Sequence, residues 1–327
     1  MVTLVPQRRG DFNHQTVVSA IEINFADMLP TWTYGPLVQD GLYLYGSFRT
    51  ADGRLQTLLR KCASELSYGL VHNISNGEFL ETSPRQAEAF RGGSVRFSAD
   101  DDHFHMHVGM ARSPGEPFSL ELTREPARTK VVWDEGEILH LEGFIVGNAG
   151  VQMYDPMRDG GNLYCSYMIR ASGHILGDPV EGFFGFDQQH LRPGTIWRTA
   201  PYFNELEIAW HTATTEYDDG TIEVGQICHG GKDWGFAVML NNDGPFKLTT
   251  DVTAKITFGD DEFPKKVEYL IDGEEWDWVS SADGTMPAYA KDATYRPADG
   301  TTTRRGETRR VVTSAGWLDA FCDGRSS

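Results

Sequence analysis

One short segment, 182–193, carries several side chains that can do chemistry. A carboxylate, two amides and an imidazole follow one another from Asp187 to His190, with the amides beginning at Gln188. A carboxylate three residues from an imidazole can supply an acid and a base whose pKa values are separated by burial. The spacing makes Asp187 and His190 the candidate catalytic residues, and Asp187 is the stronger candidate for acid–base work.

Aromatic residues flank this carboxylate in the sequence. Phe184 and Phe186 precede Asp187, and Trp197 follows it. Apolar walls with a few polar groups are typical of a small-molecule pocket. Such walls would raise the pKa of Asp187 toward neutrality, so that it can donate a proton to an alkene or a leaving oxygen. Two alternatives stay open: Arg192 pairs with Asp187 and makes it structural, or the segment only contributes to a core.

Three histidines alternate in the segment 103–107, at His103, His105 and His107. On a strand they share one face, with roughly 6–7 Å between successive side chains. Two of them can share a metal, and the third needs strand twist or bending. Three interpretations remain: a solvated or hydrogen-bonded face, a pocket wall that includes His105, or a metal site. No HExxH motif or Cys/His knuckle supports the metal, so we assign no metal ligands.

Trp210 and His211 are adjacent, so on a strand they point to opposite faces. We expect Trp210 in the core and His211 outside, with the reverse left open. Tyr154, Tyr164 and His211 are further candidates for orienting a polar group of a substrate. The full set of expected substrate-binding residues is Tyr154, Tyr164, Phe184, Phe186, Gln188, Trp197, Trp210, His211 and His105.

Short alternating runs recur along the chain, separated by turn signals such as 218–220 and 272–273. No long stretch has apolar residues at helical spacing. Strands at intervals of roughly 8–12 residues are the pattern of sandwiches and barrels, so we predict an all-β fold. We also predict one short helix at 84–90 and loops at 151–161 and 292–310.

The chain is longer than one ordinary domain, at 327 residues. Hydrophobic residues make up 40% and aromatic residues 12%, which is enough for a sizeable core or two. The expected strands divide almost equally about the polar loop at 155–161. We therefore predict two domains, 1–158 and 159–327.

Charge and cysteine usage limit the partners and the compartment. The net charge of −18 argues against nucleic acid and anionic membranes, because phosphates would be repelled. Cys62, Cys165, Cys228 and Cys322 are far apart and form no CxxC pair, as expected of thiols in a reducing compartment. No apolar segment is long enough to span a membrane or serve as a signal peptide. We expect a cytoplasmic protein that does not insert into membranes, and the sequence leaves a homodimer open.

Motifs for common cofactors are missing from the sequence. We find no GxGxxG opening a helix after a strand, no GxxxxGK[ST] and no GxSxG elbow. Nicotinamide, flavin and nucleoside-triphosphate chemistry are therefore disfavoured, and we expect no cofactor. An enzyme of this composition would use acid–base groups in a dry pocket.

The region 163–279 resembles the two-domain lipocalin-like (calycin) superfamily that includes carotenoid hydratases, kievitone hydratase and fungal Diels–Alderases. In that group a glycine-containing strand ends in Asp, followed by a basic or amide residue, a polar residue and an aromatic residue, often Trp. Here the run 185–190 reads Gly-Phe-Asp-Gln-Gln-His. Gln188 stands where Arg or His is common, and His190 where Trp is common. Trp197 and Trp210 further along also look like that group.

The resemblance implies two lipocalin-like antiparallel β-barrel domains packed together. It also implies a pocket for a hydrophobic small molecule, at one barrel mouth or between the domains. The superfamily hosts hydration, cyclisation and elimination, so the resemblance does not select a reaction. We expect a cofactor-independent lyase, hydratase or isomerase acting on a terpenoid, polyketide, steroid or aromatic compound. The alternatives are a non-catalytic carrier of a hydrophobic ligand and a metal-dependent enzyme that uses the three-histidine face.

Overall fold

The computed structural model describes residues 16–63, 68–83, 93–110, 118–156, 161–195, 200, 207–231, 234–290 and 294–322. Strands dominate these residues, which confirms the all-β prediction. The described helices are short 3-10 turns: η3 (Phe25–Met28), η5 (Val146–Asn148) and η7 (Pro287–Tyr289). No helix in this part of the chain is long and apolar enough to cross a membrane.

Fourteen antiparallel strands, β1 to β14, form the first sheet. Their bounds are β1 (Val17–Glu22), β2 (Thr33–Tyr34), β3 (Leu37–Thr50), β4 (Leu55–Ala63), β5 (Tyr68–Ser75), β6 (Leu80–Thr82), β7 (Gly93–Ala99), β8 (His103–Met110), β9 (Phe118–Arg124), β10 (Thr129–Asp134), β11 (Leu139–Ile145), β12 (Ala149–Asp155), β13 (Asn162–Ile175) and β14 (Asp178–Leu191). The main path runs β6-β5-β4-β3-β14-β13-β11-β10-β9-β8-β7, and β12 pairs with β13 and β1 at one side.

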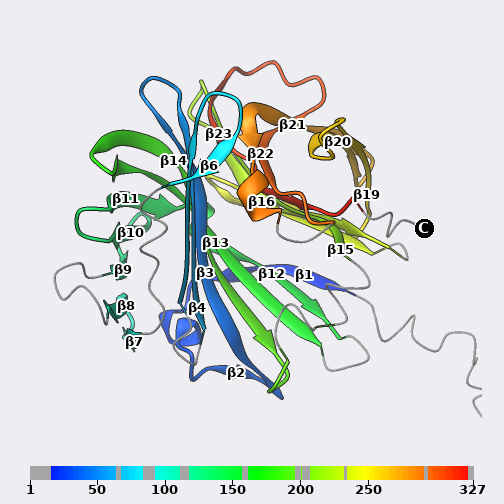
Figure 1. Ribbon diagram of the computed structural model, residues 1–327. Coiled ribbons are helices and arrows are strands. Elements are labelled where there is room, and N and C mark those ends of the chain that lie inside the picture. Colours follow the sequence, from blue (N-terminus) through cyan, green and yellow to red (C-terminus); the bar gives the residue numbers. More distant parts are fainter. Residues whose placement is uncertain are drawn as a thin grey trace, which may run out of the picture.

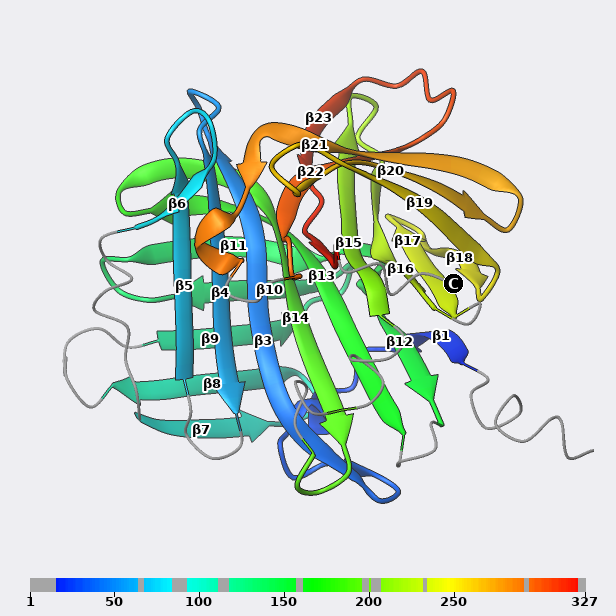
Figure 2. The ribbon, with the colours of Figure 1, turned by 45° about the vertical axis from the view of Figure 1, so that its right-hand side comes forward.

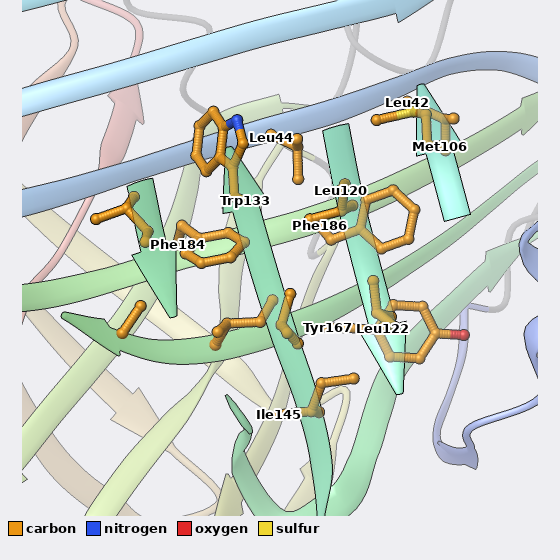
Figure 3. Packing of buried hydrophobic residues seen from close by; sticks show 14 of the residues in the cluster. Leu42, Leu44, Met106, Leu120, Leu122, Trp133, Ile145, Tyr167, Phe184 and Phe186 are labelled. Carbon is orange, nitrogen blue, oxygen red and sulfur yellow. The ribbon is translucent and has the colours of Figure 1, made fainter. Parts of the chain in front are cut away.

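The first sheet bends back over itself as a half-barrel. In Figure 2, β3, β4, β5, β13 and β14 form one layer, and β7 to β11 cross behind it. The space between these layers is filled by a hydrophobic core that includes Trp133, Tyr167, Phe184 and Phe186 (Figure 3). Apolar residues alternate along each strand, so one face of the sheet collapses into this core.

Ten strands, β15 to β24, form the second sheet. Their bounds are β15 (Glu207–Tyr217), β16 (Ile222–Gly230), β17 (Gly235–Asn241), β18 (Gly244–Thr249), β19 (Val252–Phe258), β20 (Pro264–Ile271), β21 (Glu274–Thr285), β22 (Ala298–Arg304), β23 (Val311–Ala315) and β24 (Leu318–Ala320). The end strand β19 contacts β16 and β17, so this sheet curls into a nearly closed barrel (Figure 1). Its interior core includes Tyr269, Trp276 and Trp278.

The two sheets pack against each other through the faces that their own cores leave free. A second hydrophobic cluster joins Met168 and Phe183 of the first sheet to Trp210 and Phe236 of the second. Arg170 of β13 also forms an ion pair with Glu216 of β15, at 2.6 Å. β13, β14 and β15 are thus covered on both faces, and their side chains are mostly buried.

The structure corrects two of the predicted loops. Residues 151–155 of the predicted loop 151–161 belong to β12, because they pair with β13 and β1. Residues 298–304 of the predicted loop 292–310 form β22, a threonine-rich strand paired with β21. The predicted helix at 84–90 lies outside the described residues.

The predicted domain boundary at 158 and 159 falls between β12 and β13, which pair within one sheet. The boundary as such stays a prediction. The sheets themselves change over between Leu191, the last residue of β14, and Glu207, the first residue of β15. We propose the segment between these residues as the division between the two halves of the molecule. All four cysteines are free thiols, as predicted.

Candidate active site between the two sheets

Asp187 lies on β14, on the face of the first sheet that meets the second. Its neighbours across the sheet are Ser166 on β13 and Tyr43 on β3. Residues 183, 185 and 187 share this face, because side chains alternate along a strand. The residue is 6% exposed, so the carboxyl group is almost fully removed from solvent.

Two hydroxyl groups bind the Asp187 carboxyl group. The Tyr164 hydroxyl donates to Oδ2 at 2.5 Å, and the Ser166 hydroxyl donates to Oδ1. Tyr164 and Ser166 are two residues apart on β13, so they share the face of Asp187. Each carboxyl oxygen therefore has a partner, which allows the group to be buried.

Burial raises the pKa of Asp187 from its ordinary value of 3.8 to about 7. Hydrogen bonds from Ser166, Tyr164 and Tyr45 favour the charged form and act in the opposite direction, but burial is the larger effect. Near neutral pH this carboxyl group is present in both protonation states. It can therefore donate or accept a proton at little cost in free energy, as a general acid–base catalyst must.

The hydrogen-bond network continues into the second sheet. The Gln226 side chain on β16 donates from Nε2 to the Tyr164 hydroxyl at 2.9 Å and to the Tyr45 hydroxyl at 3.0 Å. Thr212 on β15 shares a hydrogen bond of 2.9 Å with the Tyr45 hydroxyl. Burial, followed by the charge of Asp187, raises the pKa of Tyr45 and Tyr164 well above 10. Both phenols stay neutral hydrogen-bonding groups.

Gly185 makes room for one member of this network. A Cβ atom at position 185 would lie 2.6 Å from the ring of Tyr45, closer than two carbon atoms can approach. The Tyr45 ring lies across the strand at this position, and its hydroxyl group reaches Thr212 and Gln226. A side chain at position 185 would therefore require the Tyr45 ring to shift.

Aromatic rings of the second sheet face the same network. Trp210 on β15 meets Tyr164 edge-on, with 4.7 Å between ring centroids. Trp317 meets Tyr45 edge-on at 6.1 Å. The two tryptophans keep 9% and 7% exposure, in the same range as Asp187. Apolar rings around a few polar groups match the composition expected of a small-molecule site.

His190 does not join Asp187, which corrects the predicted pairing. It lies on the opposite face of β14, where it meets Trp32 edge-on at 5.0 Å. The reason is geometric: positions three apart on a strand point to opposite faces. Burial lowers the pKa of His190 from 6.5 to about 4, so the ring is neutral at physiological pH.

Phe184, Phe186 and Gln188 also lie on the face of β14 that points away from Asp187. The two phenylalanines pack in the core of the first sheet, against Trp133 and Tyr167 (Figure 3). Gln188 donates from Nε2 to the Met28 carbonyl at 3.0 Å. The expectation that phenylalanines wall Asp187 is therefore wrong, because both alternate away from it.

Among the other predicted residues, Tyr164 and Trp210 lie at the site. His211 points into the barrel of the second sheet, stacks on Tyr269 at 5.6 Å and hydrogen-bonds Thr302 at 2.9 Å. Burial lowers the pKa of His211 to about 3. We expected His211 to point outside, but it is buried because β15 is covered on both faces.

Two further candidates lie elsewhere. Tyr154 meets Tyr34 edge-on at 5.4 Å and packs with Trp32, on the His190 side of the first sheet. Trp197 lies outside the described residues. Arg192 is exposed in the turn after β14, and the hydroxyl groups described above are the hydrogen-bond partners of Asp187.

The three histidines lie on the outer face of β8, with 6.3 Å between the rings of His105 and His107. His103 faces Asp100 at 3.3 Å, and His105 faces Glu121 at 3.7 Å. This is the solvated, hydrogen-bonded face among the interpretations of the sequence, and it places His105 away from Asp187. Within the described ranges, no three His, Cys, Asp or Glu side chains are grouped to hold a metal ion.

Sequence reasoning missed Ser166, Tyr45, Thr212 and Gln226. Ser166 could be predicted from the sequence, because alternation puts it on the same face as Tyr164 two residues earlier. The other three come from strands far away in the chain: Gln226 lies 181 residues from Tyr45. No local pattern indicates such a contact.

No known family model matches the chain. Among solved structures, the crystal structure of CghA is similar, with a TM-score of 0.51, 10% sequence identity, and coverage of 93% of this chain and 98% of that one. Kievitone hydratase from Nectria haematococca gives a TM-score of 0.43 at 9% identity, over 92% and 96% of the two chains. The likeness to CghA is one of fold, and it confirms the two-domain lipocalin-like fold that the sequence resemblance implied.

Proposed function

We propose that the protein is a cofactor-independent acid–base enzyme, a lyase, hydratase or isomerase, acting on a hydrophobic small molecule between the two sheets. One observation carries the proposal: the carboxyl group of Asp187 is buried in a hydrogen-bonded network and has a pKa of about 7. A buried carboxyl group with a strongly raised pKa is costly for stability, and such groups cluster at functional sites.

The chemistry follows from the two protonation states of Asp187. In its neutral form the group donates a proton to an alkene carbon or to a leaving oxygen. The carboxylate that remains is stabilised by the hydroxyl groups of Tyr164 and Ser166. It then takes a proton back from water or from the substrate. Trp210 and Trp317 supply apolar surface for the substrate and exclude water, which keeps the group in its dehydrated state.

The experiment compares Asp187→Asn with a matched control, Asp299→Asn. Asp299 on β22 is also fully buried, and burial raises its pKa to about 6, but its oxygens accept from Ser281 and the Gly316 amide. Wild type and both variants are incubated with terpenoid, polyketide, steroid and aromatic compounds, and products are identified by mass spectrometry.

We expect Asp187→Asn to lose about 10²-fold or more in turnover, as for removal of a general acid, and Asp299→Asn to keep it. Folding is checked by circular dichroism. Equal turnover in Asp187→Asn and wild type would contradict the proposal. If a compound binds stoichiometrically and neither wild type nor either variant converts it, the protein is a carrier instead.

A further inference from the structure

A second carboxyl group, Asp319 on β24, lies on the face of the second sheet that meets the first. Its neighbour across the sheet is Trp210, and Trp210 meets Tyr164, the residue that binds Asp187. Directly paired residues of antiparallel strands point to the same face. Asp319 therefore points to the first sheet, one strand away from Trp210.

The hydrogen bonds that the described residues donate to Asp319 all reach one of its oxygens. The Tyr295 hydroxyl donates to Oδ1 at 2.6 Å, and the Trp317 indole donates to the same atom at 2.7 Å. Among the described residues, Oδ2 accepts no hydrogen bond. Asp187 differs, because each of its oxygens has a donor. Within the described part of the chain, Asp319 is thus held in place through Oδ1, and Oδ2 is the oxygen that can take up a proton.

Electrostatics couple the two groups, since the charge of Asp319 is one of the causes that raise the pKa of Asp187. Burial also raises the pKa of Asp319, from 3.8 to about 6. The hydrogen bonds distinguish their roles. Both oxygens of Asp187 accept from hydroxyl groups, which stabilise the carboxylate that remains after it donates a proton. The donors to Asp319 both bind Oδ1, so Oδ2 is the atom that can take up a proton.

We propose that Asp319 is the second proton-transfer group of this site, acting as the base while Asp187 acts as the acid. This inference rests on the proposed function and adds its base and its substrate class. In a dehydration, Asp319 takes a proton from carbon, and the C–H electron pair forms the double bond. Asp187 protonates the hydroxyl group as the C–O bond breaks, and water leaves. Proton exchange with solvent returns both groups to their starting states.

The strength of the base restricts the substrate. A carboxylate is too weak a base to remove a proton from an unactivated carbon, but it can remove one next to a carbonyl group. Trp210 and Trp317 add apolar contacts. The substrate class is therefore a hydrophobic β-hydroxy ketone or the enone that it forms.

The first test needs no substrate. Protein labelled with carbon-13 at the aspartate carboxyl groups is titrated by NMR, and the midpoint of Asp187 is compared among wild type, Asp319→Asn and Asp299→Asn. We expect the Asp187 midpoint to fall by about 0.5–1 pH unit in Asp319→Asn, because the neighbouring negative charge is lost. In Asp299→Asn, which keeps Asp319, the midpoint should not change. An equal midpoint in wild type and Asp319→Asn would overturn the pairing.

The second test uses the aldol of benzaldehyde and acetone, a hydrophobic β-hydroxy ketone whose dehydration gives an ultraviolet-absorbing enone. We expect wild type and Asp299→Asn to dehydrate it, and Asp319→Asn to be slower by about 10²-fold. In wild type the rate falls at low pH as Asp319 becomes protonated and at high pH as Asp187 ionises. The fall at low pH is lost in Asp319→Asn, which a purely structural role would not produce.

The outcomes separate the two proposals. Full activity in Asp319→Asn together with loss in Asp187→Asn would overturn this inference and leave the proposed function standing. Full activity in both variants would overturn both. Absence of dehydration by wild type would overturn the assignment to β-hydroxy ketones, and Asp187→Asn on the wider set of compounds still tests the proposed function.

Discussion

One face of β13 and β14 carries Tyr164, Ser166 and Asp187, and the opposite face carries Phe184 and Phe186. Both faces are formed by the same two strands, because successive side chains along a strand point to opposite faces. The apolar face packs in the core of the first sheet, where it needs no partners (Figure 3). The polar face meets the second sheet, where Thr212 and Gln226 complete its hydrogen bonds.

This difference shows where a fold of this kind can do chemistry. Core side chains gain stability from close packing, and a carboxyl group among them needs a partner within the core, as Glu135 has in Arg60 at 2.8 Å. Between the sheets, each side contributes donors, so Asp187 can be both dehydrated and hydrogen-bonded. The interiors of the half-barrel and barrel are packed mainly with apolar side chains, whereas the contact between the sheets holds the hydrogen-bonded network around Asp187.

The largest expected effect concerns the apolar face. Phe184 packs against Trp133 with 5.2 Å between ring centroids and is almost completely buried. Phe184→Ala should lower the free energy of unfolding by about 3–5 kcal/mol, measured by chemical denaturation. The NMR midpoint of Asp187 should stay in place, because the cavity opens on the other side of the strand. A shifted Asp187 midpoint in Phe184→Ala would show that the two faces of the strand do not act independently.

The next effect concerns the polar face and its pH dependence. Because the pKa of Asp187 is raised in the folded protein from 3.8 to about 7, its neutral form stabilises the fold below about pH 4, and this contribution is lost as the pH rises through 7. Asp187→Asn cannot ionise. The difference between the free energy of unfolding of this variant and that of wild type should therefore increase in favour of the variant by on the order of 4 kcal/mol between about pH 4 and pH 8. A gap that does not change with pH would contradict the raised pKa.

A smaller effect comes from the donors to Asp187. Tyr164→Phe removes a hydrogen bond that favours the charged carboxylate, so the pKa of Asp187 should rise further, by about one pH unit. Tyr167→Phe is the matched control, since Tyr167 is on the same strand and belongs to the opposite face. Equal midpoints in the two variants would show that the Tyr164 hydrogen bond does not set the pKa.

The smallest effect is expected at His190. His190→Gln changes a buried ring against Trp32 on the apolar side of β14. The midpoint of Asp187 in the NMR titration should change by less than about 0.2 pH unit, because the two side chains lie on opposite faces. A larger shift would show that they interact after all.

The sequence was sufficient for the all-β class, because alternation and turn residues are local signals. Of the predicted site residues, Asp187, Tyr164 and Trp210 lie together in the structure, and their role in a site stays a prediction. The sequence prediction misplaced His190 and Phe186, although period-two alternation alone puts them opposite Asp187. The run 185–190 is a continuous part of β14, so its side chains alternate without interruption.

The remaining members of the site could not be predicted from local patterns. Tyr45, Thr212 and Asp319 belong to the surroundings of Asp187 only because β3 pairs with β14 and because the second sheet packs on this face. These contacts join residues that are far apart in the chain, such as Tyr45 and Thr212 at a separation of 167. Strand order and sheet packing are determined by the whole fold, so one sequence does not reveal them.

The pKa of Asp187 in the wild-type protein is the most direct test of this account. It is measured by NMR titration of carbon-13-labelled aspartate carboxyl groups, with the signal assigned by its absence from Asp187→Asn. We predict a midpoint of about 7, because burial between the sheets outweighs the hydrogen bonds from Tyr164 and Ser166. A midpoint near the ordinary 3.8 would contradict the central claim, since Asp187 would then be a permanently ionised structural group at neutral pH.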